Sequence, residues 1–163
     1  MRAASRMRGL FLLATIATVP GSPHSTPAHP DFSGTWVLDV SKSEGNSLPT
    51  SATLKVTQSD KSMTLERTES QNGTTGRITD TYMLDGSPSK NTRNAFGTTI
   101  DFNSTVAWSE EVLVITTRWT FDGRSFESTD LYSLSDDRKL LTIAKEALIN
   151  GAPLTMRQVY TKQ

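Results

Sequence analysis

The chain between residues 33 and 161 contains no cysteine and no histidine, which limits the chemistry it can perform. A thiol nucleophile, a Ser-His-Asp triad and a histidine-ligated metal site are excluded from that segment. Paired carboxylates could still act as acid and base, and two pairs exist, Glu110-Glu111 and Asp136-Asp137. Both pairs fall at predicted turns, where solvated loop residues are expected. We therefore predict that the protein is not an enzyme and needs no cofactor or metal ion.

Four charged residues fall at positions predicted to face the inside of the fold: Arg67, Asp80, Asp130 and Lys145. Arg67 is expected opposite or diagonal to Asp80, and Asp130 diagonal to Lys145, which predicts two inward ion pairs. One interpretation is that they are polar anchors in a ligand cavity, because such cavities are mostly apolar with a few placed polar groups. The other is that each pair neutralises itself inside a packed barrel or at a wet rim. Both interpretations require pairing, because an unpaired buried charge is costly.

Apolar and polar residues alternate with a period of two in nine stretches, which predicts an all-β fold. The stretches are 33–40, 52–59, 62–69, 77–85, 99–108, 112–121, 125–134, 139–147 and 154–161. Asn-Gly and Asp-Gly pairs at 72–73, 85–86, 122–123 and 150–151 indicate turns, because these residues accept positive φ. No stretch has a sustained helical period. We predict an antiparallel up-and-down meander that closes into a barrel of eight to ten strands.

The odd number of stretches is a difficulty, because a closed antiparallel meander needs an even number of strands. The sequence leaves three explanations: an imperfect seam, a tenth strand hidden in 86–97, or one strand divided in two. A sandwich of two packed sheets is the alternative architecture. We favour closure, since it removes the exposed strand edges that invite aggregation.

Tight turns predict which residues lie opposite one another. A two-residue turn at Asp122-Gly123 places Trp119, Thr117, Ile115 and Leu113 opposite Phe126, Ser128, Asp130 and Tyr132, respectively. Carrying the register through 135–138 places Asp130 beside Ile143 and Ser128 beside Lys145. Alternating strand direction puts the loop 41–51 and the turn 70–76 at one end. It puts the loop 86–98 and the turn 122–123 at the other end.

Inward aromatic side chains either line a site or fill the lumen, since an eight-stranded barrel has room for one small ligand at most. They are Trp36, Tyr82, Phe102, Trp108, Trp119, Phe121, Phe126 and Tyr132. Combined with the four charged residues, they suggest candidate ligand-binding positions. These are Arg67, Asp80, Tyr82, Trp108, Trp119, Asp130, Tyr132 and Lys145.

The N-terminal segment has the pattern of a secretory signal peptide. Three arginines precede an apolar run at 9–19, which is shorter than the roughly 20 residues that span a bilayer. We predict a signal peptide at 1–21, a flexible Pro-rich leader at 22–31 that holds both histidines, and one domain at 32–163. Cleavage after residue 21 and cleavage after residue 28 both fit. The mature chain is expected to be secreted or periplasmic, without a membrane span.

Charge narrows the choice of partners. Without Arg2, Arg6 and Arg8 the chain has 17 acidic and 14 basic residues, a net charge near −3. This mild acidity, without a basic cluster, argues against nucleic acid as a partner. We expect a monomer whose partner, if any, is a small hydrophobic molecule.

The opening Gly34-Thr-Trp36 of the domain resembles the first-strand Gly-x-Trp motif of lipocalins. The longer pattern from Gly34 to Ser43 is similar to a group of small exported bacterial β-barrel proteins without an assigned function. The resemblance implies a lipocalin-like barrel in which Trp36 plugs one end, and a basic residue of the last strands, here Arg157, packs over its ring. It also implies that the loop after the first strand covers the barrel mouth, so we expect the open end to carry 41–51. Unlike lipocalins, the chain has no cysteine for a disulfide.

Three functional hypotheses remain, in order of preference. The first is an exported barrel that binds a small hydrophobic or amphipathic ligand. The second is a non-catalytic structural or protein-interaction module of the cell envelope. The third is an enzyme that uses carboxylates at the barrel mouth. A cavity inside the barrel would favour the first, and a completely filled lumen would exclude it.

Overall fold

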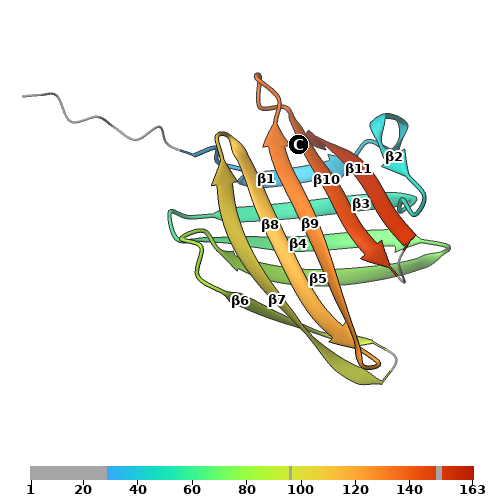
Figure 1. Cartoon of the computed structure of the whole chain (residues 1–163). Coiled ribbons are helices and arrows are strands. Elements are labelled where there is room, and N and C mark those ends of the chain that lie inside the picture. The colour runs from blue at the N-terminus through green and yellow to red at the C-terminus, as the bar shows by residue number, and fades with distance from the viewer. Residues whose placement is uncertain (1–28, 96, 150–151) are drawn as a thin grey trace, which may run out of the picture.

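The computed structural model describes residues 29–95, 97–149 and 152–163, and it shows an antiparallel sheet curled into a nearly closed barrel (Figure 1). The strands are β1 (Gly34–Leu38), β2 (Glu44–Gly45), β3 (Ser51–Gln58), β4 (Ser62–Gln71), β5 (Thr74–Met83), β6 (Ser89–Ala95), β7 (Thr98–Ser109), β8 (Val112–Phe121), β9 (Arg124–Leu134), β10 (Leu140–Ile149) and β11 (Ala152–Lys162), with one short 3₁₀ helix, η1 (Val40–Lys42). Their order in the sheet is β5-β4-β3-β1-β11-β10-β9-β8-β7-β6, and β2 pairs separately with β11. The predicted all-β, lipocalin-like barrel is confirmed. Within these ranges no helix is long and apolar enough to cross a membrane.

Alternating side chains and tight turns produce the meander as predicted. In β3 the residues Ala52, Leu54 and Val56 are buried and their neighbours face solvent. Asn72 and Gly73 have φ values of 50° and 78°, the left-handed pair that a two-residue hairpin requires. The predicted pairing of β8 with β9 is confirmed from Leu113↔Tyr132 to Trp119↔Phe126.

The hidden tenth strand exists and changes the assignment of the barrel ends. Strand β6 lies within 86–97, so the chain reverses direction once more than the nine stretches imply. The turn at Asp122-Gly123 therefore lies at the same end as the 70–76 turn and the 41–51 loop, which corrects our prediction for it. The loop 86–98 is not a single connection, because β6 runs from one end of the barrel to the other.

The barrel closes at a seam between β5 and β6 that has no backbone ladder in the sheet order. Side chains of β6 make the connection instead. Asn91 Oδ1 accepts a hydrogen bond from the Thr81 amide (2.9 Å), and Asn91 Nδ2 donates to the Thr81 carbonyl oxygen (3.1 Å). Ser89 Oγ accepts from the Met83 amide at 2.8 Å. An imperfect seam and a tenth strand are thus both present.

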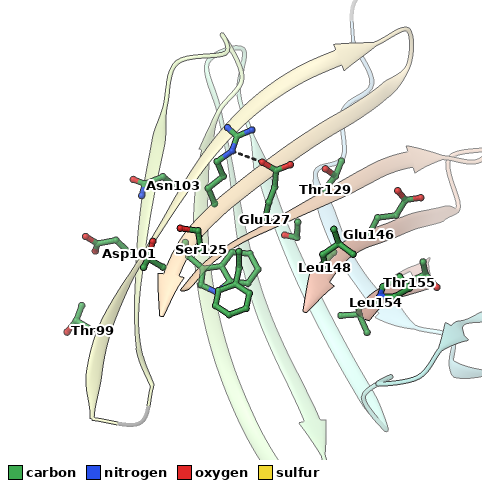
Figure 2. A pocket seen from close by; sticks show the side chains of 17 residues that line it. Thr99, Asp101, Asn103, Ser125, Glu127, Thr129, Glu146, Leu148, Leu154 and Thr155 are labelled. Atoms are coloured by element: carbon green, nitrogen blue, oxygen red, sulfur yellow. Dashed lines mark ion pairs between the residues drawn. The ribbon is translucent and has the colours of Figure 1, made fainter. Parts of the chain in front are cut away.

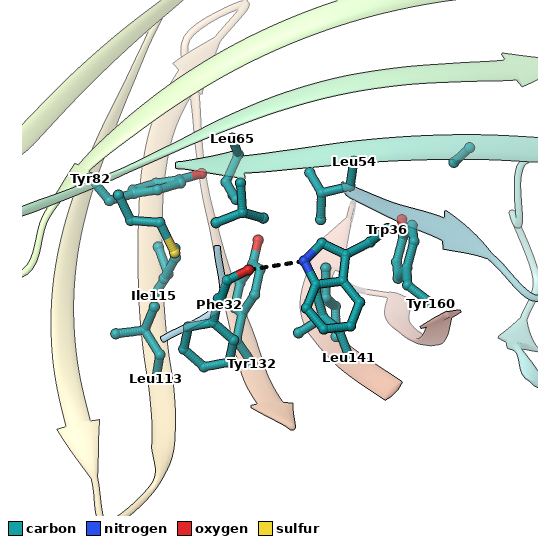
Figure 3. Packing of buried hydrophobic residues seen from close by; sticks show 14 of the residues in the cluster. Phe32, Trp36, Leu54, Leu65, Tyr82, Leu113, Ile115, Tyr132, Leu141 and Tyr160 are labelled. Carbon is teal, nitrogen blue, oxygen red and sulfur yellow. Dashed lines mark hydrogen bonds between the residues drawn. The ribbon is translucent and has the colours of Figure 1, made fainter. Parts of the chain in front are cut away.

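One end of the barrel is filled by a packed core around Trp36 (Figure 3). The Trp36 side chain is fully buried, and its Nε1 donates to the Phe32 carbonyl oxygen at 2.9 Å. Leu54, Leu113 and Leu141 are equally buried in this cluster. Trp36 therefore closes this end of the barrel, as the lipocalin resemblance implied.

The cation over Trp36 is Lys162 and not Arg157. Lys162 Nζ lies 5.1 Å from the centre of the Trp36 ring, and Lys162 pairs with Trp36 across the β1–β11 ladder. Arg157 is an odd number of residues away from Lys162 along β11, so its side chain lies on the opposite, outer face of the strand. There its Nη1 donates a hydrogen bond to the Lys42 carbonyl oxygen. Gly34 explains the close approach of Lys162: a Cβ at Gly34 would lie 2.9 Å from Lys162 Cε, and its φ of 140° disfavours other residues.

Candidate functional site

The half of the barrel away from Trp36 holds a cavity of about 260 Å³. Its wall contains seven of the eight predicted ligand-binding residues, all except Trp108. The lining residues are Arg67, Ile78, Asp80, Tyr82, Asn91, Arg93, Phe102, Ser104, Thr117, Trp119, Ser128, Asp130, Tyr132, Lys145, Ala147 and Leu154. Five of these side chains carry a charge, which is unusual for an interior that is otherwise mostly apolar.

Asp130 and Lys145 form one of the two predicted ion pairs. Lys145 Nζ lies 3.2 Å from Asp130 Oδ1, and the Asp130 side chain is only 10% exposed. The two residues are directly opposite each other in the β9–β10 ladder, and Ile143 is opposite Tyr132. Our predicted register for these two strands was therefore shifted by two residues. The pair forms anyway, because the shift keeps both side chains on the inward face.

Asp80 pairs with Arg93 and not with Arg67, which corrects the second predicted pair. Arg93 Nη2 donates to Asp80 Oδ2 at 2.6 Å across the β5–β6 seam. Arg67 is diagonal to Asp80 as expected, because Leu65 is opposite Asp80 and Ile78 is opposite Arg67. Arg93 also lies against an aromatic ring, with Cζ 4.3 Å from the centre of Phe102.

Arg67 is left without a partner. In the described ranges it makes no ion pair and no hydrogen bond, and its Nε is buried. Burial opposes the charge of Arg67, yet the pKa of its guanidinium is raised, because groups that are negative when ionised surround it. These groups are Tyr132, Tyr160, Glu69 and Asp130. Arg67 therefore stays protonated inside the barrel.

Several polar atoms in the same region are buried without a hydrogen-bond partner. They are Arg67 Nε, Asp80 Oδ1, Arg93 Nε, Asp130 Oδ1 and Tyr160 Oη. Of these, Asp130 Oδ1 has the ion-pair contact with Lys145 Nζ at 3.2 Å, without the geometry of a hydrogen bond. Each buried polar group of this kind lowers the stability of the folded state by about 1–3 kcal/mol unless water or a ligand forms a hydrogen bond with it. All except Tyr160 belong to residues of the cavity wall. The cavity can therefore offer both donors and acceptors to a molecule inside it.

A second, larger cleft of about 910 Å³ adjoins the cavity (Figure 2). The β9–β10 ladder ends at Ala147↔Ser128, although β9 begins at Arg124 and β10 continues to Ile149, so the two strands separate. The cleft lies in this gap, and it shares Trp119, Ser128, Ala147 and Leu154 with the cavity. The interior is therefore reached through the side of the barrel. The loop 41–51 was expected to cover the open end of the barrel. No residue of this loop lines the cavity or the cleft.

The rim of the cleft combines charged and apolar side chains. Arg118 and Glu127 form an ion pair on the outer face, drawn as a dashed line in Figure 2. Leu148 projects on the opposite side of the cleft and is 62% exposed. Trp119 and Phe126 stack with ring centres 5.5 Å apart at the inner edge. Because Trp119 lines both spaces, a molecule passing from the cleft into the cavity would pass this ring.

Trp108 is the one predicted ligand-binding residue that lies outside the cavity. It packs against the core at the plugged end, and its ring stacks on that of His29 at 4.1 Å. The predicted carboxylate pairs are both at exposed turns of the barrel surface. No cluster of three or more metal-ligating side chains occurs in the described ranges.

The sequence interpretation missed Arg93, Asn91 and Ser89, the three residues that bridge the seam. All three are on β6, whose inward positions carry polar side chains, so it shows no apolar alternation. Every residue from Ser89 to Asn94 is polar, so the sequence offers no alternation that would single out the three inward positions. Lys162 was missed because Arg157 was the expected cation.

Comparison with known proteins supports the fold. No protein-family model matches the chain, and no curated protein matches it. Among solved structures, the chain is similar to the zebrafish ileal bile acid-binding protein complexed with cholic acid. The TM-score is 0.57 and the sequence identity is 15%, over 81% of this chain and 98% of that chain. The shared feature is the nearly closed antiparallel barrel.

Proposed function

We propose that this protein is a non-catalytic barrel that binds a small amphipathic molecule, with one end in the interior cavity and the rest in the β9–β10 cleft. The observation that supports this most strongly is the cavity itself, which lies next to a filled core and contains buried polar atoms without partners. A barrel built only as a scaffold would gain stability by filling that space with apolar side chains.

The size of the two spaces supports an elongated ligand. The cavity of about 260 Å³ is smaller than the roughly 300–1,000 Å³ of common ligand pockets. Together with the adjoining cleft of about 910 Å³ the space is ample. The structural neighbour is described as complexed with cholic acid, an amphipathic molecule, and this likeness in fold is consistent with the proposal.

We also propose that the protein acts after export, in the periplasm or outside a bacterial cell. The basic N-terminus and the apolar run at 9–19 support this, and both lie outside the described residues. An envelope interaction module is the less favoured alternative. The large apolar side chains exposed in the described part of the chain are Val37, Val40 and Leu148. Leu148 belongs to the cleft, so it already has a place in the binding proposal.

A fluorescence titration tests the binding function. N-phenyl-1-naphthylamine, a neutral apolar dye that brightens in apolar surroundings, is titrated into the full chain. Ala147→Trp should weaken binding about 10-fold or more, because Ala147 faces both spaces and overpacking costs about 1–3 kcal/mol. Ala144→Trp is the matched control, since it adds the same ring to the outer face of the same strand. Equal affinity in both variants, or no binding to the unchanged chain, would reject the proposal.

A further inference from the structure

We propose that Arg67 binds a singly charged anionic group, a carboxylate or sulfonate, at the inner end of an amphipathic ligand. This inference rests on the proposed binding function and adds the chemical class of the ligand. The inference is based on one observation: the unpaired guanidinium of Arg67 lies beside two ion pairs, Asp80–Arg93 and Asp130–Lys145, in the same cavity wall.

The charges in the cavity wall do not balance. Arg67, Arg93 and Lys145 are positive, and Asp80 and Asp130 are negative. Asp80 is matched by Arg93 at 2.6 Å and Asp130 by Lys145 at 3.2 Å. The remaining positive charge belongs to Arg67. Arg67 is partly buried, and its Nε is buried without a hydrogen-bond partner, so a negative group of a ligand would supply both the missing acceptor and the missing counter-charge.

The position of Arg67 suits the inner end of a ligand. Arg67 is opposite Leu54 on one side and Ile78 on the other, next to the layer in which Leu65 and Tyr132 close the packed core. It thus forms part of the cavity floor. The cleft lies at the other side of the cavity, beyond Trp119. A charged end at Arg67 would leave an apolar tail directed toward the cleft.

The buried Nε of Arg67 has no acceptor at this floor. Guanidinium nitrogen atoms donate in a planar fork that matches the two oxygen atoms of a carboxylate, and sulfonate oxygens accept in a similar way. The floor therefore provides hydrogen-bond donors as well as charge.

Nearby acids limit the charge of the ligand to one. Asp80 and Asp130 lie in the same cavity wall as Arg67, and Glu69 lies two residues further along the same face of β4. A phosphate monoester carries close to two negative charges at neutral pH, and these carboxylates would repel the second one. The negative charge of Glu69 also competes with a ligand for Arg67, although no ion pair joins the two residues in the described structure. Removing Glu69 should therefore strengthen anion binding.

Isothermal titration of the full chain at pH 8 with three probes of equal chain length tests the inference: dodecanoate, 1-dodecanol and dodecyl phosphate. Dodecanoate should bind about 10-fold or more tightly than dodecanol, as expected for hydrogen bonds to a charged group. It should also bind more tightly than dodecyl phosphate. Equal affinities for dodecanoate and dodecanol would overturn the role of the anion while leaving the binding function intact. Failure of every probe to bind would reject the binding function and this inference together.

Variants assign the preference to Arg67. In Arg67→Met the affinity for dodecanoate should fall to that for dodecanol, and the affinity for dodecanol should not change. Glu69→Gln removes a charge of opposite sign from the same face of the same strand, and it should increase the preference for dodecanoate. Arg67→Lys keeps the charge and should keep part of the preference if Arg67→Met does not fold. A preference that survives in folded Arg67→Met, or that disappears in Glu69→Gln, would overturn the assignment.

Discussion

Arg93 on β6 and Asp80 on β5 join the two strands that close the barrel, with 2.6 Å between Arg93 Nη2 and Asp80 Oδ2. Because β5 and β6 are not neighbours in the backbone ladder, this ion pair and three side-chain hydrogen bonds replace the bonds of a regular sheet. The same pair lies in the cavity wall. Closure of the barrel and the polarity of its interior therefore depend on the same residues.

Arg93→Met is expected to destabilise the protein by about 1–3 kcal/mol. This is less than for a fully buried pair and more than for a surface pair, because the side chains are 35% and 10% exposed. The matched control on the same strand is Lys90→Met, which removes a pair with side chains 60% and 46% exposed and should cost at most about 1 kcal/mol. Urea unfolding of the three proteins measures the difference. Equal stability of the two variants would show that the seam does not depend on Arg93.

Asn91→Ala should open the seam locally. The Thr81 amide loses the acceptor Oδ1, and the Thr81 carbonyl oxygen loses the donor Nδ2. Hydrogen exchange of the Thr81 amide, followed by NMR, should therefore become faster, because protection depends on that hydrogen bond. Thr92→Ala, at the neighbouring outward position of β6, is the control and should leave Thr81 protected. Slow exchange of Thr81 in Asn91→Ala would contradict the seam structure.

The cation over Trp36 gives a third prediction. Lys162→Met should reduce stability by about 0.5–1 kcal/mol, the usual contribution of an exposed cation over an aromatic ring. Arg157→Met should change stability by less than about 0.5 kcal/mol, because Arg157 is exposed and makes one surface hydrogen bond. Thermal or urea unfolding of both variants decides between the residues. A larger loss in Arg157→Met would restore the residue implied by the sequence resemblance.

The sequence predicted the strands whose inward faces are apolar, because burial imposes alternation on them. It also predicted the register of β8 with β9, since the two-residue turn at Asp122-Gly123 leaves a single way to pair the strands. The longer turn between β9 and β10 allows several registers. There the prediction was shifted by two residues, although Asp130 and Lys145 still meet.

Strand β6 could not be identified by alternation, for a reason connected with its role. Its inward residues Ser89, Asn91 and Arg93 bridge to β5 and must be polar. From the sequence this strand was only one of three explanations and its residues were not assigned, which had two consequences. Asp80 was paired with Arg67 and not with Arg93, and the unpaired state of Arg67 was not foreseen. The side cleft was also unforeseeable, because it depends on how far the β9–β10 ladder extends.

The three tyrosines of the chain are all buried in the core and all resist ionisation. Desolvation is the main cause in each case, and it raises the pKa of Tyr82, Tyr132 and Tyr160 above the ordinary value of about 10. The Asp80 carboxylate adds to the effect at Tyr82, and Tyr82 and Asp130 add to it at Tyr132. In the unfolded chain the same three groups would titrate near pH 10.

Stability should therefore fall as the pH rises above about 10, because the unfolded chain releases tyrosine protons that the folded protein retains. This contribution is fully present below the unfolded pKa and is lost as the pH rises through the folded pKa. Absorbance at 295 nm, which reports tyrosinate, should stay low in the folded protein at pH 10.5 and rise only together with loss of circular dichroism. The chain in 8 M urea is the control and should titrate with a midpoint of about 10. Tyrosinate formation near pH 10 in protein that is still folded would contradict this prediction, because it would show that the hydroxyls are not desolvated in the folded state.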